Sequence, residues 1–296
     1  MPEATMSGEA LENLISATVA APSLGHSQPW RIRLDPDTTT LEVRAAPGRD
    51  TSYAEHADRV LHIAVGAALF NLRLAAAELG QDAGVRLLPD PGDPDLLASL
   101  RLTRPRRRGQ ADDRALYDAL WHLHDSRFGF SGRPVPAGVL AELADAARTE
   151  GALLVMPGPA ETDRLVRLSA EADRRGPGHG LGDVRGEWEQ GRGERRRTDR
   201  EDRAYHRDAA PAIGLLTTPF DRPEDWLRAG EALERVLLTA TARSVRSSLL
   251  HQALGWADLR RALYVRQADR GERRHPQMLL RVGYGPEAAD LVPPPR

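Results

Sequence analysis

Residues 21–30 read APSLGHSQPW, a run rich in proline, serine and glycine that ends on a large aromatic residue. A loop of this composition exposes backbone N–H groups, which can donate hydrogen bonds to the oxygens and nitrogens of a planar heterocycle. The alternative is a structural turn in which Trp30 serves only as a core anchor, and composition alone favours that alternative. The sequence on either side of the loop has to distinguish the two.

The loop joins a predicted helix to a predicted β-hairpin. Residues 8–20 carry four large apolar side chains at helical spacing, which indicates an amphipathic helix that ends at Pro22. Two short apolar runs, residues 30–34 and 41–45, then flank the turn-forming sequence Asp35-Pro36-Asp37. The expected buried face of the helix consists of Leu11, Leu14, Ile15 and Val19.

A long helix is predicted over residues 57–79, with Gly80 as its C-terminal cap. Its residues are apolar on nearly all sides, which is typical of a helix in the middle of a domain. Strands near residues 85–88 and 97–102 follow, and an arginine-rich connector at 104–109 ends what we interpret as the first half of the chain.

The second half repeats this order of elements. The middle of its long helix, GEALERVLLTATA, has the same small-and-leucine texture as GAALFNLRLAAAELG in the first half, which indicates an internal repeat. The pattern predicts helices over residues 112–122, 137–148, 161–174, 223–242 and 258–264, and strands over 152–156, 212–217 and 278–282.

The stretch from 174 to 208 has no apolar periodicity and consists mainly of Gly, Arg, Asp and Glu. Its balanced charges favour a solvated loop. Its length also allows a lid that covers a bound ligand and restricts or blocks entry. A nucleic-acid contact through Arg195-Arg196-Arg197 is the weakest of the three interpretations, because acidic residues interleave and no nucleic-acid-binding motif accompanies them.

Composition excludes several classes of function. With 41 basic and 43 acidic residues and a net charge of -2, the chain has no overall bias toward nucleic acid or anionic membranes. The absence of lysine and cysteine excludes Schiff-base chemistry, a P-loop lysine, thiolate nucleophiles and thiolate metal sites. There is no GxSxG elbow or HExxH motif, and no set of ligands suggests a metal. Without a signal-peptide pattern or a membrane-spanning apolar run, we expect a cytoplasmic protein.

The loop at residues 22–30 resembles the PSxxNxQPW segment of the FMN-dependent nitroreductases, and nearly the whole chain is similar to their fused, dormancy-associated Acg-like branch. This resemblance implies an α+β, nitroreductase-like fold in which two fused pseudo-symmetric half-repeats mimic the homodimer of the family, with a lid-like insertion. The halves would span residues 1–110 and 111–296, with the lid at about 174–208. The blocks that support the resemblance are GAALFNLRLAAAELG, PDPGDPDLLASLRL, RPVPAGVLAELADAARTEGA, DWLRAGEALERVLLTATA and HPQMLLRVGYGP.

The resemblance further implies one composite FMN pocket. In homodimeric relatives the loop comes from the partner of the subunit that supplies an Arg-x-Ser-x-basic segment; here the first half has the loop and the second half has HDSRF at residues 124–128. His26, His124 and Phe128 depart from the asparagine, arginine and basic residue of the family pattern, which leaves Arg127 as the one cation of its segment. The candidate cofactor-binding residues are Pro22, Ser23, Leu24, His26, Gln28, His124, Ser126, Arg127, Ser247, Ser248 and Arg296.

Three of these residues keep a structural alternative. Ser247 and Ser248 match a loop that contacts the edge of the flavin ring in relatives, but they could also cap the preceding helix. Arg296 could supply a second contact to the cofactor phosphate, which normally has more than one charge-assisted partner, or it could be a frayed terminus.

The resemblance implies an oxidoreductase in which FMN performs the chemistry. Hydride arrives from NADH or NADPH and a nitroaromatic or quinone takes the electrons, so the chain needs no catalytic acid or base of its own. His26 is expected to tune the site because its charge changes near neutral pH. The alternatives are a binding protein that sequesters flavin or another small ligand with little turnover, and a flavin-free scaffold. We expect a monomer that acts as an internal pseudo-dimer and binds small molecules, with no nucleic-acid or membrane partner.

Overall fold

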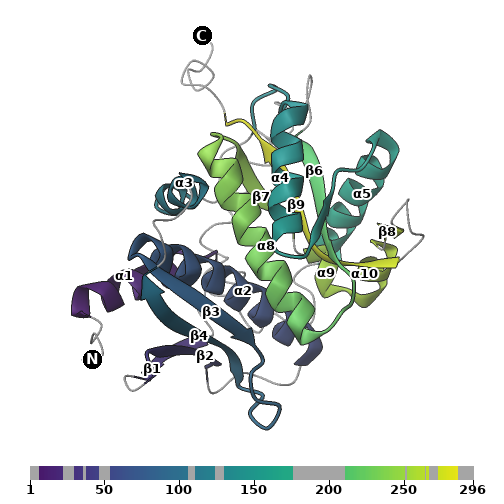
Figure 1. Ribbon diagram of the computed structural model, residues 1–296. Coiled ribbons are helices and arrows are strands. Elements are labelled where there is room, and N and C mark those ends of the chain that lie inside the picture. The colour runs from purple at the N-terminus through teal and green to yellow at the C-terminus, as the bar shows by residue number, and fades with distance from the viewer. Residues whose placement is uncertain are drawn as a thin grey trace, which may run out of the picture.

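The computed structural model consists of two antiparallel sheets, each accompanied by one long helix (Figure 1). It describes residues 7–22, 30–35, 38–46, 54–105, 111–123, 130–175, 211–250, 252–263, 265–266 and 273–285. The helices are α1 (Gly8–Val19), α2 (Ala54–Glu78), α3 (Ala111–Leu120), α4 (Ala137–Thr149), α5 (Pro159–Arg175), α8 (Pro223–Ala242), α9 (Gln252–Gly255) and α10 (Ala257–Ala262).

The two sheets have the same strand order. The first sheet has the order β1-β2-β4-β3, and the second has the order β5-β6-β9-β7, with β8 paired to β9. The strands are β1 (Trp30–Asp35), β2 (Thr40–Ala45), β3 (Gln81–Leu87), β4 (Leu96–Pro105), β5 (Leu153–Val155), β6 (Ala212–Thr218), β7 (Arg246–Leu249), β8 (Val265–Arg266) and β9 (Arg273–Gly283).

The chain follows the same path twice. In the first half a helix, two strands, a long helix and two strands follow one another as α1, β1, β2, α2, β3 and β4. In the second half α4, β5, β6, α8, β7 and β9 take the same positions, and α5, α9, α10 and β8 are additions to that path. This repetition is the arrangement that the similar texture of the two long helices predicts.

The long helices α2 and α8 cross at the centre of the molecule, between the two sheets (Figure 1). Their backbones touch at two glycines: a Cβ added to Gly66 would lie 2.0 Å from the Leu227 carbonyl oxygen, and one added to Gly230 would lie 2.0 Å from the Ile63 carbonyl oxygen. The contact is reciprocal, because each carbonyl belongs to the residue three positions before the partner glycine. Reciprocity of this kind is the property of an isologous interface, so the helix pair has local twofold symmetry.

Each sheet and its long helix enclose one hydrophobic core, and each core also includes buried residues of the opposite long helix. Ile63 of α2 packs into the core of the second half, and Leu227 of α8 packs into the core of the first half. The helix α3 contributes Leu116 and Leu120 to the first core. The predicted boundary at residue 110 assigns α3 to the second half, although its buried side chains belong to the first core. The boundary itself stays a prediction.

Most predicted elements are present, and the differences have physical reasons. In α1 the buried residues are Leu14, Ala17 and Thr18, while Ile15 and Val19 are 41% and 52% exposed. Of the four predicted residues, Leu14 is buried and Leu11 packs against the first core, while small residues complete the packed face because α1 lies close against α2. The strand β7 was not predicted, because four residues with two serines show no strand pattern on their own.

The first long helix is a core element. Its stretch Asp58–Glu78 is long and apolar enough to cross a membrane by composition alone, yet 89% of its apolar 18-residue window is buried inside the molecule. The helix ends at Glu78 and is followed by Gly80, whose φ of +72° is the left-handed conformation common just after the C-terminus of a helix.

Candidate functional site

Ser247 and Ser248 lie on β7, the edge strand of the second sheet, and their backbones pair with Val282 and Arg281 of β9. Both earlier interpretations of their position, a loop or a helix cap, are corrected by this placement, because α8 ends at Ala242 and β7 begins at Arg246. The Ser247 hydroxyl is buried and has no hydrogen-bond partner among the described residues. A buried hydroxyl without a partner is costly, so it indicates a group that the described chain does not supply.

Residues 130–133, which follow the predicted phosphate segment, contact the C-terminal end of β9 and the residue after it. The backbone N–H of Ser131 donates to the Tyr284 carbonyl oxygen at 2.7 Å, and the guanidinium of Arg133 lies 4.2 Å from the centre of the Tyr284 ring. Phe130 packs against Gly283, where a Cβ would lie 2.8 Å from the ring. Phe130, two positions after the HDSRF segment, and Gly285, the last described residue, therefore both lie beside β7 and β9.

Several predicted site residues lie outside the described residues. They are Ser23, Leu24, His26, Gln28, His124, Ser126, Arg127 and Arg296, together with residues 176–208 of the predicted lid. The ends of the first-half loop are described: Pro22 is half-buried after α1, and Trp30 is 7% exposed in the first core at the start of β1. Trp30 is thus a core anchor, as the structural interpretation of the loop expects.

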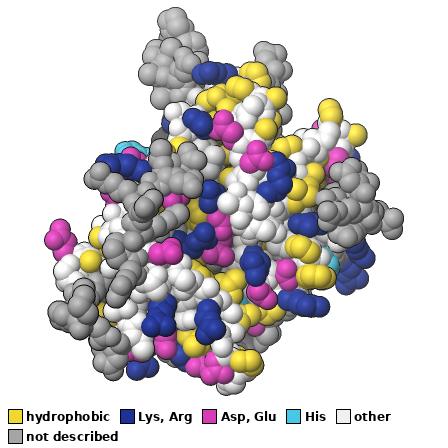
Figure 2. Space-filling model, viewed as in Figure 1, with side chains coloured by type: hydrophobic (Ala, Val, Ile, Leu, Met, Phe, Trp, Pro, Cys, Tyr) yellow, Lys and Arg dark blue, Asp and Glu magenta, His cyan; other side chains and the backbone are white. Residues whose placement is uncertain are grey.

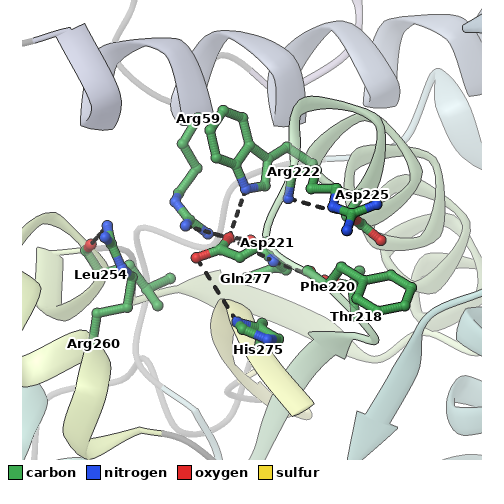
Figure 3. A network of polar contacts seen from close by, with 11 residues as sticks. Arg59, Thr218, Phe220, Asp221, Arg222, Asp225, Leu254, Arg260, His275 and Gln277 are labelled. Carbon is green, nitrogen blue, oxygen red and sulfur yellow. Dashed lines mark hydrogen bonds and ion pairs between the residues drawn. The ribbon is translucent and has the colours of Figure 1, made fainter. Parts of the chain in front are cut away.

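Sequence reasoning missed a buried polar network that joins α2 to the second half (Figure 3). The guanidinium of Arg59, which is 1% exposed, donates to the side chains of Asp221 and Gln277. The indole Nε1–H of Trp226 donates to the same Asp221 oxygen at 2.7 Å, and the Gln277 amide donates to the Thr218 hydroxyl at 2.7 Å. Nothing in the apolar pattern of α2 distinguishes Arg59 from a solvated charge, because its partners are more than 150 residues away in the sequence.

The charges of this network offset one another. Burial by itself would raise the pKa of Asp221, but hydrogen bonds from Trp226 and Arg59 and the positive charge of Arg59 lower it below its usual value. Burial lowers the pKa of His275, whose Nδ1 lies 4.0 Å from an Asp221 oxygen. The ionised carboxylate and the buried guanidinium neutralise each other across the contact between the halves, so removal of either one would leave an unpaired charge there.

A second buried polar pair lies in the interface of α2 and α8. Glu234 and Asn71 are completely buried, and none of their side-chain oxygen and nitrogen atoms has a hydrogen-bond partner of ordinary geometry among the described residues. Burial raises the pKa of Glu234 to about 8, and the neighbouring Asn71 amide offsets part of that rise. Glu234 is therefore protonated at neutral pH.

Metal binding requires a cluster of ligating side chains, and nucleic-acid binding requires a basic surface. The described residues contain no group of three or more His, Asp or Glu side chains able to hold a metal ion. On the face shown in Figure 2, basic and acidic side chains of the described chain are interspersed, without a broad area of one sign. This surface lacks the basic stripe that binding to nucleic acid requires.

Comparison with known proteins supplies the family. No protein-family model matches the chain. A Mycobacterium tuberculosis protein provisionally named NAD(P)H nitroreductase is 32% identical over 313 residues, which cover 97% of this chain and 88% of that protein. A second one from that organism, provisionally named NAD(P)H nitroreductase acg, is 27% identical over 333 residues, covering 100% of this chain and 94% of the relative.

A solved structure agrees with the fold. The crystal structure of a provisionally named nitroreductase from Anabaena variabilis superposes with a TM-score of 0.50 at 12% identity and covers 95% of this chain and 74% of that one. At this identity the match concerns the fold alone. Full-length similarity to the mycobacterial proteins, together with the repeated antiparallel sheets and their paired central helices, shows that the chain belongs to the NAD(P)H nitroreductase family.

Proposed function

We propose that this chain is an FMN-dependent oxidoreductase that takes hydride from NADH or NADPH and reduces a nitroaromatic or a quinone. The observation that supports it most strongly is that several second-half segments lie together where the start of β7 pairs with the C-terminal end of β9. There Ser247 and Ser248 pair with β9. Phe130 and Ser131, which follow the HDSRF segment, contact Gly283 and Tyr284 of the same region. FMN when bound supplies the hydride and electron chemistry.

The chain has hydrogen-bond donors that suit the ring and the phosphate of FMN. The unpartnered Ser247 hydroxyl is a buried donor of the kind that a polar heterocycle satisfies. Ser248 faces the opposite side of β7 from Ser247, while His124, Ser126, Arg127 and Arg296 are assigned to the phosphate. The loop residues Pro22, Ser23, Leu24, His26 and Gln28 are assigned to the other side of the ring.

The chain's own task is binding, orientation and exclusion of water. His275, the histidine of β9, lies 4.0 Å from Asp221 in the network between the halves, at the end of the strand that is away from Gly283. We further propose that the chain is a cytoplasmic monomer whose two halves replace the two subunits of a homodimer. NAD(P)H appears in the names of the mycobacterial relatives, and the oxidation assay compares NADH with NADPH.

A visible spectrum and an oxidation assay test the proposal. The purified chain mixed with FMN and desalted should be yellow, with flavin absorption in the near-UV and blue, and should oxidise NADH or NADPH faster when a nitro compound or quinone is added. Ser247→Ala should retain less FMN, while Ser99→Ala, on β4 of the first sheet, should retain the wild-type amount. A colourless protein whose melting temperature FMN does not change would contradict the proposal.

A second candidate is a flavin-binding protein with little turnover. It is favoured by the sequence of residues 124–128, where His124 and Phe128 replace cations of the family pattern. A flavin-loaded sample that oxidises neither nicotinamide, with any of several nitro compounds and quinones, would identify this second function.

A further inference from the structure

One face of the β7 and β9 pair gathers two arginines and a serine. In an antiparallel pair, residues directly opposite each other share a face, and so do alternate residues of one strand. Arg246 lies opposite Gly283, and Ser248 lies opposite Arg281. The register therefore places Arg246, Ser248 and Arg281 on one face, which we call the β7–β9 arginine face.

Phe130 forms a wall on this face. Its ring packs on Gly283, where any side chain would collide with it, because an added Cβ would lie 2.8 Å from the ring carbon Cδ1. The guanidinium carbon of Arg281 lies 5.7 Å from the centre of the ring, within the range of a cation–π contact. Phe130 thus limits the positions that the Arg281 side chain can take.

The two arginines of the β7–β9 arginine face form no ion pair with a carboxylate of the described residues. Neither Arg246 nor Arg281 forms an ion pair or a side-chain hydrogen bond with a described residue, and the Nε of Arg281 is buried without a partner. Other partly buried arginines are paired: Arg73 and Arg235 both donate to Glu150, at 2.7 and 3.0 Å. Arg246 is exposed, so it is the half-buried Arg281 guanidinium whose missing partner indicates an anion from outside the described chain, and Arg246 adds a second cation on the same face.

We propose that Arg281 and Arg246, together with the Ser248 hydroxyl, bind the phosphate of FMN. The proposal rests on the proposed FMN function. Arginine suits this task because its planar group donates two parallel hydrogen bonds to phosphate oxygens. The site also replaces the cations that His124 and Phe128 leave out of the family's phosphate segment, which joins the structure at Phe130 on the same face.

Comparison of FMN with riboflavin, which lacks the phosphate, tests the assignment. Dissociation constants of both flavins are measured by fluorescence quenching for the full-length chain and for Arg281→Gln, Arg246→Gln and Arg261→Gln. Loss of a charged hydrogen bond predicts FMN binding weaker by about 10- to 100-fold in Arg281→Gln and Arg246→Gln. Riboflavin binding should not change in these variants. Arg261→Gln changes the net charge equally on the exposed surface of α10 and should leave both constants unchanged.

The outcomes separate this proposal from the proposed function. If Arg281→Gln and Arg246→Gln keep the wild-type ratio of FMN to riboflavin affinity, whether both constants change equally or neither changes, the phosphate assignment is wrong and the FMN function stands. If the wild-type chain binds neither flavin, the FMN function fails and this proposal fails with it. Circular dichroism and melting temperature show that each variant is folded, and Arg281→Lys should recover part of the FMN affinity because it restores the charge.

Discussion

Glu234 is the residue whose burial has the clearest consequence. Its carboxyl is completely buried between α2 and α8, and burial raises its pKa to about 8 from an ordinary value of 4.5. The folded state therefore binds a proton that the unfolded state releases at intermediate pH. The stability that this group contributes is fully present below pH 4.5 and is lost as the pH rises through about 8.

The first prediction is that the free energy of unfolding falls between about pH 5 and pH 8 and that Glu234→Gln removes much of this fall. At pH 8 the variant should be more stable than the wild type by roughly 2–4 kcal/mol, since one pKa unit corresponds to about 1.4 kcal/mol. Urea unfolding at several pH values measures it, with the exposed Glu142→Gln as control. Parallel curves for wild type and Glu234→Gln would show that the buried carboxyl is not protonated.

Arg59 is the second residue whose role follows from burial. Its partners Asp221 and Gln277 belong to the second half, so its removal leaves a carboxylate partly buried and unpaired. We predict that Arg59→Met lowers the free energy of unfolding by about 3–5 kcal/mol. The double variant with Asp221→Asn should lose less, because no unpaired charge remains, and Arg228→Met, which breaks an exposed pair with Glu224, should cost under about 1 kcal/mol. Equal losses in the single and double variants would rule out the unpaired charge as the cause.

At the scale of elements, the contact of α2 with α8 depends on two glycines. No side chain fits at Gly230, since a Cβ would lie 2.0 Å from the Ile63 carbonyl oxygen and 2.8 Å from the Gly66 Cα. Both neighbours are backbone atoms, so relief requires the helices to move apart. Such a movement separates the packed faces of both cores, because each core includes buried residues of the opposite long helix.

Gly230→Ala should therefore destabilise the fold by about 3 kcal/mol or more, at the upper end of overpacking effects. The matched control is Gly138→Ala in the first turn of α4, where nothing lies within 4 Å of the added methyl group. This control should be neutral or stabilise by up to about 1 kcal/mol, because alanine has the higher helix propensity. Thermal and urea unfolding distinguish the two, and a Gly230→Ala protein as stable as Gly138→Ala would disprove the close helix contact.

At the scale of the whole molecule, the two halves share a path but differ in one connection. In the first half, residues 20–29 join α1 to β1 and include the nitroreductase-like loop; in the second half, only residues 150–152 join α4 to β5. This short turn contains Gly151 at a φ of +80°, and Glu150 is held there by Arg73 and Arg235. The second half thus has no segment equivalent to residues 21–30.

One flavin site per chain follows from this asymmetry under the proposed function. Titration with FMN should reach its end point at about one equivalent per chain of 32.5 kDa, and light scattering coupled to gel filtration should give the mass of a monomer. A homodimeric nitroreductase arrangement would instead contain two equivalent pockets. Two equivalents per chain would refute the single composite pocket, and binding only by a dimer would refute the internal pseudo-dimer.

The local sequence pattern was sufficient to predict many of the helices and strands of this molecule. Helical spacing of apolar residues placed α8 at residues 223–242 as observed, and alternation around Asp35-Pro36-Asp37 predicted the hairpin of β1 and β2. The similar texture of the two long helices indicated the repeat. These features depend on neighbours within a few residues, so a single sequence contains them.

Other features depended on residues that meet only in the folded chain. The strand β7 exists because β9 pairs with it, and its serines show their face only through that register. Arg59 in a polar network, Glu234 with a raised pKa and Gly230 against a carbonyl oxygen are likewise set by residues more than 150 positions away. The sequence by itself thus determined the family, the order of elements and the repeat, while the tertiary structure decided which polar groups are buried and which arginines share a face. The physical reason is that burial and strand register arise from contacts between distant segments, whereas helix and turn formation arises from adjacent residues.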